Sequence, residues 1–217
     1  NTTASNNTAV GMNAMVANTT GASNVAVGQA ALSVNTTASN NTAVGFSASY
    51  SNTTGAQNTS LGHNALYGTT TGSNNTGLGQ GALQGNTTGA SNTAVGKAAL
   101  SVNTTGGTNV AIGASTLAAN TTASDNTGVG YAVLLVNTTG TNNTGVGVNA
   151  LQANTTADDN TAVGRNALLS NTTGSNNTAV GSQAGDSITN GGKHTAVGKG
   201  ALQDQTGGEE NTAVGYL

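Results

Sequence analysis

The feature that constrains this chain most is a five-residue stretch that returns every 17 residues. It first occurs as Asn-Thr-Ala-Val-Gly at residues 7–11, and its closing glycine recurs without insertion or deletion at 11, 28, 45, 62, 79, 96, 113, 130, 147, 164, 181, 198 and 215. A fixed short period is typical of solenoid proteins, in which each repeat stacks on the next. We therefore number positions 1 to 17 within each coil, counting from residue 1. The consensus coil is N-T-T-G-S-N-N-T-A-V-G-x-x-A-L-x-x.

Composition separates this chain from an ordinary globular domain and from a disordered one. Charged residues make up 5% and aromatic residues 2% of the chain, whereas a typical domain has about 25% charged residues. A disordered polar tract needs no aliphatic residue at one fixed position, and position 10 is aliphatic in every coil. A helical period of 3.6 residues is absent, and Gly, Asn and Thr dominate. The sequence predicts an all-β fold, a parallel β-solenoid (β-roll) of thirteen 17-residue coils.

Charge and hydropathy limit the partners of the chain. A net charge of −3 gives no basic surface for nucleic acid. No run of 18 apolar residues is present, so we expect no membrane span in this segment. We expect one repeat domain over residues 1–217, with less regular terminal coils at 182–217, and we expect it to be a segment of a longer fibre because it begins and ends inside the repeat.

Two aliphatic positions, 10 and 15, are the predicted core. Position 8 holds either Thr or Val, whose side chains have the same shape, so we expect it to point inward together with position 10. Strand alternation then directs position 9 outward. The predicted core residues are Val10, Val27, Val44, Leu61, Leu78, Val95 and Ile112 at position 10, and Leu32, Leu66, Leu83 and Leu100 at position 15.

Small residues at position 9 suggest an interface. This position holds only Ala, Gly or Ser, and an outward face restricted to small residues predicts close packing against another chain or a flat ligand. The alternative is that small residues simply suit a narrow coil. The candidate interface residues are Ala9, Ala26, Ala43, Ala94 and Ala111.

The remaining positions predict turns. Asn at positions 1 and 7 is expected to form hydrogen-bonded ladders along the stack, and Gly11 is expected to form a corner with positive φ. We predict short strands at positions 7–10 and 13–17, with a third at positions 1–3 as an alternative, and a solvent-facing rim at the variable positions 12, 13, 16 and 17.

The sequence offers no arrangement for chemistry, so we expect no enzymatic activity, no cofactor and no metal site. His63 and His194 lie far apart in sequence. His63 has no carboxylate or second ligand in its own or the adjacent coils, as a general base or metal ligand would need, and His194 simply replaces the Asn of position 7. Asp158 and Asp159 form the tightest acidic pair, with Asp125 two coils away, which leaves weak cation binding as an alternative to a solvated turn.

Asn-Thr-Thr is an acceptor sequence for N-glycosylation, although it also follows directly from the repeat. The candidate glycosylation sites are Asn18, Asn35, Asn52, Asn86 and Asn103.

Thr8-Ala9-Val10-Gly11, followed by Ala14, resembles the YadA-like head repeat of trimeric autotransporter adhesins and related repeats of phage and bacterial surface fibres. The resemblance covers the whole chain through about half of each coil, and the longer Asn-Thr-Thr-Gly turn departs from it. It implies a left-handed β-roll in an elongated homotrimer or filament, extracellular or on a cell or virion surface, that adheres to host-surface or matrix ligands.

Two functions follow as hypotheses. The first is a structural or adhesive fibre segment, a rigid rod with a repetitive Asn/Thr-rich surface and weak, multivalent binding. The alternative is a surface that binds ice or another crystal through the Thr residues at positions 2 and 3.

Overall fold

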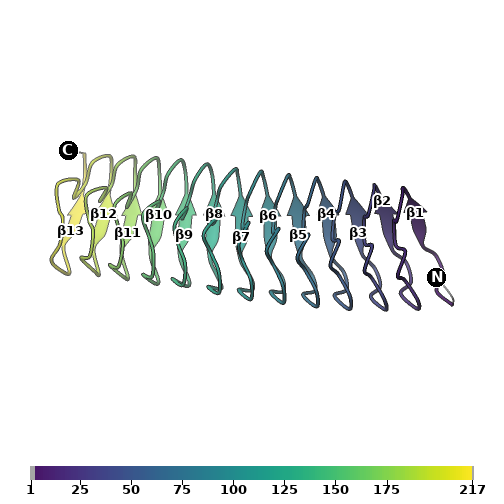
Figure 1. Cartoon of the computed structure of the whole chain (residues 1–217). Coiled ribbons are helices and arrows are strands. Elements are labelled where there is room, and N and C mark those ends of the chain that lie inside the picture. The colour runs from purple at the N-terminus through teal and green to yellow at the C-terminus, as the bar shows by residue number, and fades with distance from the viewer. Residues whose placement is uncertain (1–2, 217) are drawn as a thin grey trace. The chain divides into compact units, whose positions relative to one another are not determined.

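The computed structural model describes residues 3–216 and is all-β, as the period predicts. Each coil carries one three-residue strand, and none of the described residues is helical (Figure 1). The fold is a parallel β-solenoid. Its strands are β1 Thr8–Val10, β2 Val25–Val27, β3 Thr42–Val44, β4 Thr59–Leu61, β5 Thr76–Leu78, β6 Thr93–Val95, β7 Val110–Ile112, β8 Thr127–Val129, β9 Thr144–Val146, β10 Thr161–Val163, β11 Thr178–Val180, β12 Thr195–Val197 and β13 Thr212–Val214.

The chain forms two compact units, residues 1–108 with β1 to β6 and residues 109–217 with β7 to β13. Within each unit, neighbouring strands pair in parallel and in chain order. Equivalent positions lie directly opposite one another, as in the pairing of Thr42 with Thr59 and of Val44 with Leu61. Like residues therefore lie over like residues, which confirms the central prediction from the period.

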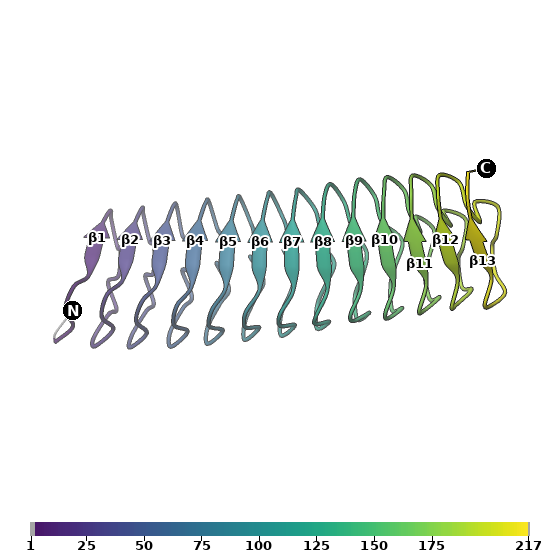
Figure 2. The ribbon, with the colours of Figure 1, turned by 180° about the vertical axis from the view of Figure 1, so that it is seen from behind.

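The rest of each coil consists of turns and bends, and the predicted strands at positions 13–17 and 1–3 are absent from the described coils (Figures 1 and 2). At positions 13–17 the reason is that the backbone at positions 13 and 15 is left-handed, with φ of +58° at Ala30 and +49° at Leu32. The hydrogen bonds still join coils: Ala30 N donates to Met12 O at 2.9 Å, whereas Leu32 N donates to Ala48 O at 3.0 Å. Positions 13 and 15 are thus hydrogen-bonded to the coils on both sides, although their backbone is not extended.

The glycine at position 11 forms the predicted corner. Gly62 has a φ of +140°, and a Cβ atom there would lie 2.6 Å from the carbonyl oxygen of Gly79. Both the conformation and the contact exclude a side chain.

The core is built from positions 9, 14 and 15. Leu32, Leu66, Leu83 and Leu100 are fully buried, as predicted. The prediction that position 10 is buried is wrong. Val10, Leu61 and Ile112 have exposed fractions of 57%, 51% and 40%, and Val27, Val44, Leu78 and Val95 are half-buried. The strand alternates as expected but in the opposite sense, with position 9 inside and positions 8 and 10 outside.

The interface prediction for position 9 is wrong for the same reason. Ala26, Ala43, Ala94 and Ala111 are fully buried, so they contact the interior of their own coil and cannot reach another chain; Ala9, in the first coil, is exposed. The narrow-coil explanation is the correct one.

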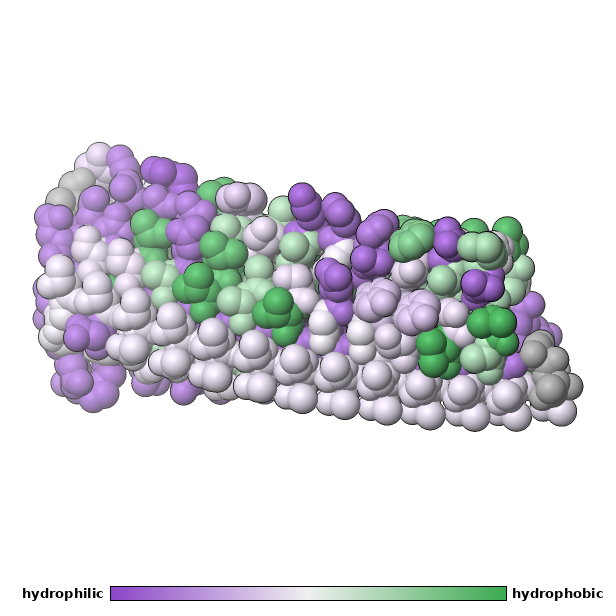
Figure 3. All heavy atoms as spheres, in the orientation of Figure 1, coloured by the Kyte–Doolittle hydropathy of each residue, from purple (hydrophilic) through white to green (hydrophobic). Residues whose placement is uncertain are grey.

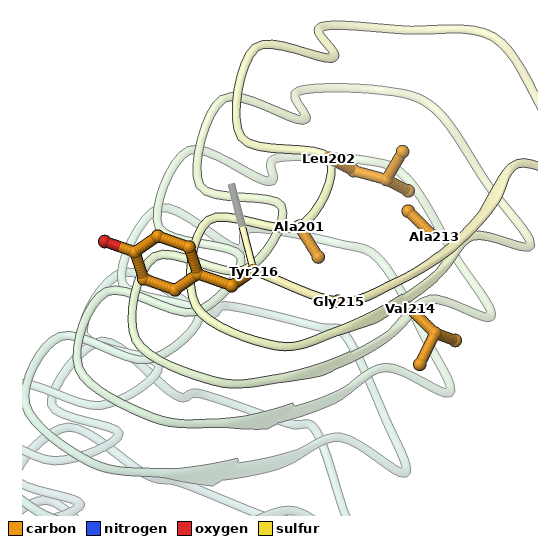
Figure 4. A pocket seen from close by; sticks show the side chains of 6 residues that line it. All are labelled: Ala201, Leu202, Ala213, Val214, Gly215 and Tyr216. Atoms are coloured by element: carbon orange, nitrogen blue, oxygen red, sulfur yellow. The ribbon is translucent and has the colours of Figure 1, made fainter.

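Figure 4 shows the alternation at the last strand, where Ala213 points toward Leu202 and Val214 points away.

Candidate functional surfaces

Buried asparagines at position 1 join successive coils through their side chains. Asn35 is fully buried, and its Nδ2 donates to Oδ1 of Asn18 at 2.8 Å and to the carbonyl oxygen of Ala38 at 3.1 Å. The same pair of bonds recurs at Asn52, Asn103, Asn137, Asn154 and Asn171. The predicted ladder is therefore present, and each rung also satisfies a carbonyl in its own turn.

A second column of buried asparagines lies at position 7. Asn41 N donates to Oδ1 of Asn24 at 2.9 Å, and Asn41 Nδ2 donates to the carbonyl oxygen of Gly55, in the next coil, at 3.0 Å. Each of these side chains bonds to the backbone of the following coil, so it fixes the distance between coils independently of the strand pairing.

The candidate glycosylation sites belong to the position 1 column, and the structure contradicts that prediction. Asn18 is 2% exposed, and Asn35, Asn52, Asn86 and Asn103 are fully buried. The Nδ2 atom that would carry the sugar instead donates hydrogen bonds inside the turn, as Asn86 Nδ2 does to Gly89 O at 3.0 Å. A glycan at these positions would have to displace the ladder.

Substitutions within the Asn columns leave buried polar atoms unpaired. Thr69 takes the place of Asn at position 1, and both its Oγ1 and the Oδ1 of Asn52 have no hydrogen-bond partner among the described residues. Ile188 takes the same place near the other end, where Oδ1 of Asn171 is likewise unpaired. Ile188 is fully buried beside Gly185, which stands where most other coils have Leu.

His194 replaces Asn at position 7 and keeps part of its role. The imidazole is 1% exposed. Its Nδ1 accepts from the backbone N–H of Asn211 at 3.2 Å, while the backbone N–H of His194 donates to Oδ1 of Asn177 at 2.9 Å. Nε2 is buried and unpaired in the part of the chain that the structure describes. The side chain is a structural member of the column, enclosed by backbone.

His63 is exposed and lies on the ring of Phe46, with centroids 5.1 Å apart. Asp158 is hydrogen-bonded to the preceding coil, since its Oδ1 accepts from the backbone N–H and the hydroxyl of Thr141. Residues 3–216 contain no group of three or more His, Cys, Asp or Glu side chains that could hold a metal ion.

Charged groups are most frequent in the last coils. Lys193 Nζ lies 3.1 Å from Oε1 of Glu210 and 3.6 Å from Oε2 of Glu209, and the hydrogen bond that Lys193 donates to Glu210 raises the pKa of Lys193. Partial burial raises the pKa of Asp186, and repulsion from Asp204 acts in the same direction.

Two ranks of outward side chains cover the strands, and we call them the strand face. Position 8 holds Thr in every coil except at Val25 and Val110, and position 10 is always Val, Leu or Ile. This is the surface that sequence reasoning placed inside the coil.

A second surface, the variable wall, comprises positions 12, 16 and 17. Its composition changes from coil to coil and includes stacked rings, as in Tyr50 and Tyr67 at 5.2 Å. Figure 3 shows a face on which hydrophobic and hydrophilic residues mix irregularly above two regular rows of intermediate hydropathy. The exposed large hydrophobic residues of the variable wall are Met12, Val16, Phe46, Tyr67, Val102, Tyr131, Val136, Val148 and Tyr216.

A third surface, the turn ridge, consists of positions 3 and 6. Thr20, Thr37 and Thr54 at position 3 are exposed, as are the mainly polar residues at position 6. It repeats in almost every coil.

Comparisons with known proteins return no matching family model, no matching curated protein and no matching solved structure. Residues 3–216 also lack any helix of the length and apolarity that crossing a membrane requires. The observations define a structural repeat protein of the β-solenoid class.

Proposed function

We propose that this chain is a structural segment of an extracellular fibre, on a cell surface or a virion, that presents adhesive groups in a rigid array. The two buried Asn columns carry the proposal. Their hydrogen bonds add side-chain connections to the backbone bonds between coils, so bending would break several satisfied buried bonds at once. No enzymatic step, cofactor or metal belongs to the proposal, in keeping with the dispersed His and Asp side chains.

Association of identical chains into a homotrimer or filament is part of the proposal. Position 9 is buried, so the contact falls to the variable wall, where exposed hydrophobic side chains gather as they do at protein interaction sites. Light scattering of the purified chain is expected to give a multiple of 20.7 kDa. Replacing Tyr67 and Val102 with Ser, both exposed, is expected to weaken association. A monomer at high protein concentration would overturn this part.

Adhesion is assigned to the turn ridge, which offers the same polar groups in successive coils. Such binding is weak for one coil and strong for many, because linked contacts act together. Its ligand class is a host-surface or matrix polymer that itself repeats.

Deletion of whole coils tests the adhesive proposal. A variant that lacks residues 35–68 is expected to keep the fold, because the period is preserved, and to adhere to immobilised matrix far more weakly than the full chain. A control that lacks residues 35–67 breaks the register and is expected to unfold. Adhesion that does not depend on the number of coils, or that is absent from the full chain, would contradict the proposal.

The hydrogen bonds of the turn leave less support for the alternative that Thr residues at positions 2 and 3 bind ice. The position 2 hydroxyls are occupied by bonds within the protein, as Thr53 Oγ1 donates to the carbonyl oxygen of Thr70 at 3.0 Å. Of these two positions, only position 3 would offer free hydroxyls among the described residues.

A further inference from the structure

The strand face has a different character from every other surface of the coil. At the variable wall, position 12 ranges from Met12 to Lys97, whereas positions 8 and 10 carry no charged residue in any coil. We propose that the strand face binds the surface of ice, with the Thr hydroxyls of position 8 and the aliphatic methyl groups of position 10 as the contact. This function goes beyond the proposed fibre role and uses a surface that role leaves free.

The strand pairing makes the face a two-dimensional lattice. Thr59 lies opposite Thr76, and Leu61 lies opposite Leu78, with no shift in register. Each rank therefore repeats at the strand spacing of about 4.8 Å, and the two ranks are separated by two residues of extended chain, or about 6.7 Å. These distances are of the same order as the repeats between water oxygens in an ice surface.

The side chains of the strand face are suited to order water molecules at fixed positions. Thr and Val are β-branched, so χ1 is restricted and the positions of hydroxyl and methyl groups are fixed. The position 8 hydroxyls, such as those of Thr76 and Thr93, make no hydrogen bond to any described residue that would draw them away from solvent. They can enter a water lattice, while the methyl groups contact it without competing for hydrogen bonds.

The narrowness of the face favours a crystal over a second copy of the chain. The strands are three residues long, so the face is about 10 Å wide, and the thirteen strands together offer about 620 Å² to a partner. Two such faces would bury about 1,240 Å² in total, which only reaches the lower limit of a stable protein interface even when every coil takes part. An ice surface needs no such minimum area on each coil, because the same weak contact repeats at every coil and the contacts act together.

One coil provides both the test variant and its control. Thr93 lies at position 8 and Thr88 at position 3 of the same coil, so Thr93→Lys places a charge on the strand face and Thr88→Lys places it on the turn ridge. Thermal hysteresis and inhibition of ice recrystallisation are measured on the full chain and both variants. Circular dichroism melts verify that both variants are folded. Hysteresis is expected in the unmodified chain, with a several-fold loss in Thr93→Lys and little change in Thr88→Lys.

Three results would overturn the inference. They are no hysteresis in the unmodified chain, equal loss in the two variants, and a Thr93→Lys variant that loses self-association in light scattering, which would make a second copy the occupant. The fibre proposal fails separately, through a monomeric mass and coil-independent adhesion, so the two failures are distinguishable.

Discussion

Replacing Thr69 with Asn is expected to stabilise the protein, because it closes a gap in the position 1 ladder. In other coils the equivalent Asn donates Nδ2 to the preceding Asn, at 2.8 Å from Asn35 to Asn18, and to a carbonyl in its own turn. At residue 69 neither bond exists, and Oδ1 of Asn52 and Oγ1 of Thr69 are both buried and unpaired. Asn at this place would have the same partners that Asn35 has, an Asn in the preceding coil and a carbonyl in its own turn.

The expected gain follows from the atoms involved. An unsatisfied buried polar atom costs about 1–3 kcal/mol, and a new hydrogen bond contributes about 0.5–1.5 kcal/mol net. Fixing the longer side chain costs up to about 1.5 kcal/mol. The balance is a stabilisation of about 1–2 kcal/mol, and since 1 kcal/mol shifts the Tm by about 2–4 °C in a chain of this size, the Tm should rise by about 2–8 °C.

Thermal and urea unfolding of Thr69→Asn beside the unmodified chain tests this expectation. The matched control is Asn35→Thr, which creates a second gap by removing the hydrogen bond that Asn35 Nδ2 donates to Oδ1 of Asn18, and which should lower the Tm by a similar amount. A Thr69→Asn variant with an unchanged or lower Tm would refute the energetic role assigned to the ladder, because the fold supplies every partner that the new side chain needs.

Three further outcomes are expected. Gly185→Leu alone should destabilise the protein by about 1–3 kcal/mol through overpacking, because even a Cβ atom there would lie 2.9 Å from Ile188 Cδ1. Combining it with Ile188→Asn should recover the lost stability. Urea titrations of the two single variants and the double variant test this coupling, and changes in unfolding free energy that simply add would contradict it. Ala98→Gly should stabilise by about 0.5–1 kcal/mol because φ is +56°, whereas Ala99→Gly, in the buried core, should destabilise; equal melting shifts would be inconsistent with a left-handed position. Desolvation raises the folded pKa of Asp186 above the ordinary 3.8, so its contribution to stability is present below that pH and lost as pH rises through the folded pKa; Asp186→Asn should therefore gain stability relative to the unmodified chain as the pH rises above 3.8, and a pH-independent difference would count against it.

Much of this fold is readable from the period alone. A constant step of 17 residues requires that like residues stack, and stacking explains the parallel register, the buried leucines of position 15 and the Asn ladders. The corner at Gly11 also follows, because only glycine recurs there. Left-handed backbone at residues such as Leu32 was not predictable, since a bulky aliphatic residue with positive φ runs against local preference and is imposed by the packing of its coil.

The facing of the strand was misassigned because the shared shape of Thr and Val is compatible with either side of a sheet. The sequence nevertheless contains pairs that identify the inner positions. Ser49 and Ser60 are rare polar residues at positions 15 and 9 of adjacent coils, and their hydroxyls hydrogen-bond at 2.9 Å. Val133 at position 14 is matched by Gly145 at position 9, where a Cβ would lie 2.5 Å from Val133 Cγ1. Such compensation within one chain requires contact, and it places position 9 inside.

The zero-shift register has a consequence for how a protein of this kind changes length. Duplication or loss of one whole period recreates at the new junction the same contacts that were there before, so no compensating substitution is needed. An insertion that is not a whole number of periods would shift the Asn columns out of register and place their amides beside residues that cannot pair with them. Growth by gene-level copying of 51-nucleotide steps is therefore structurally neutral, and the reach of such a protein can be adjusted without redesigning its interior.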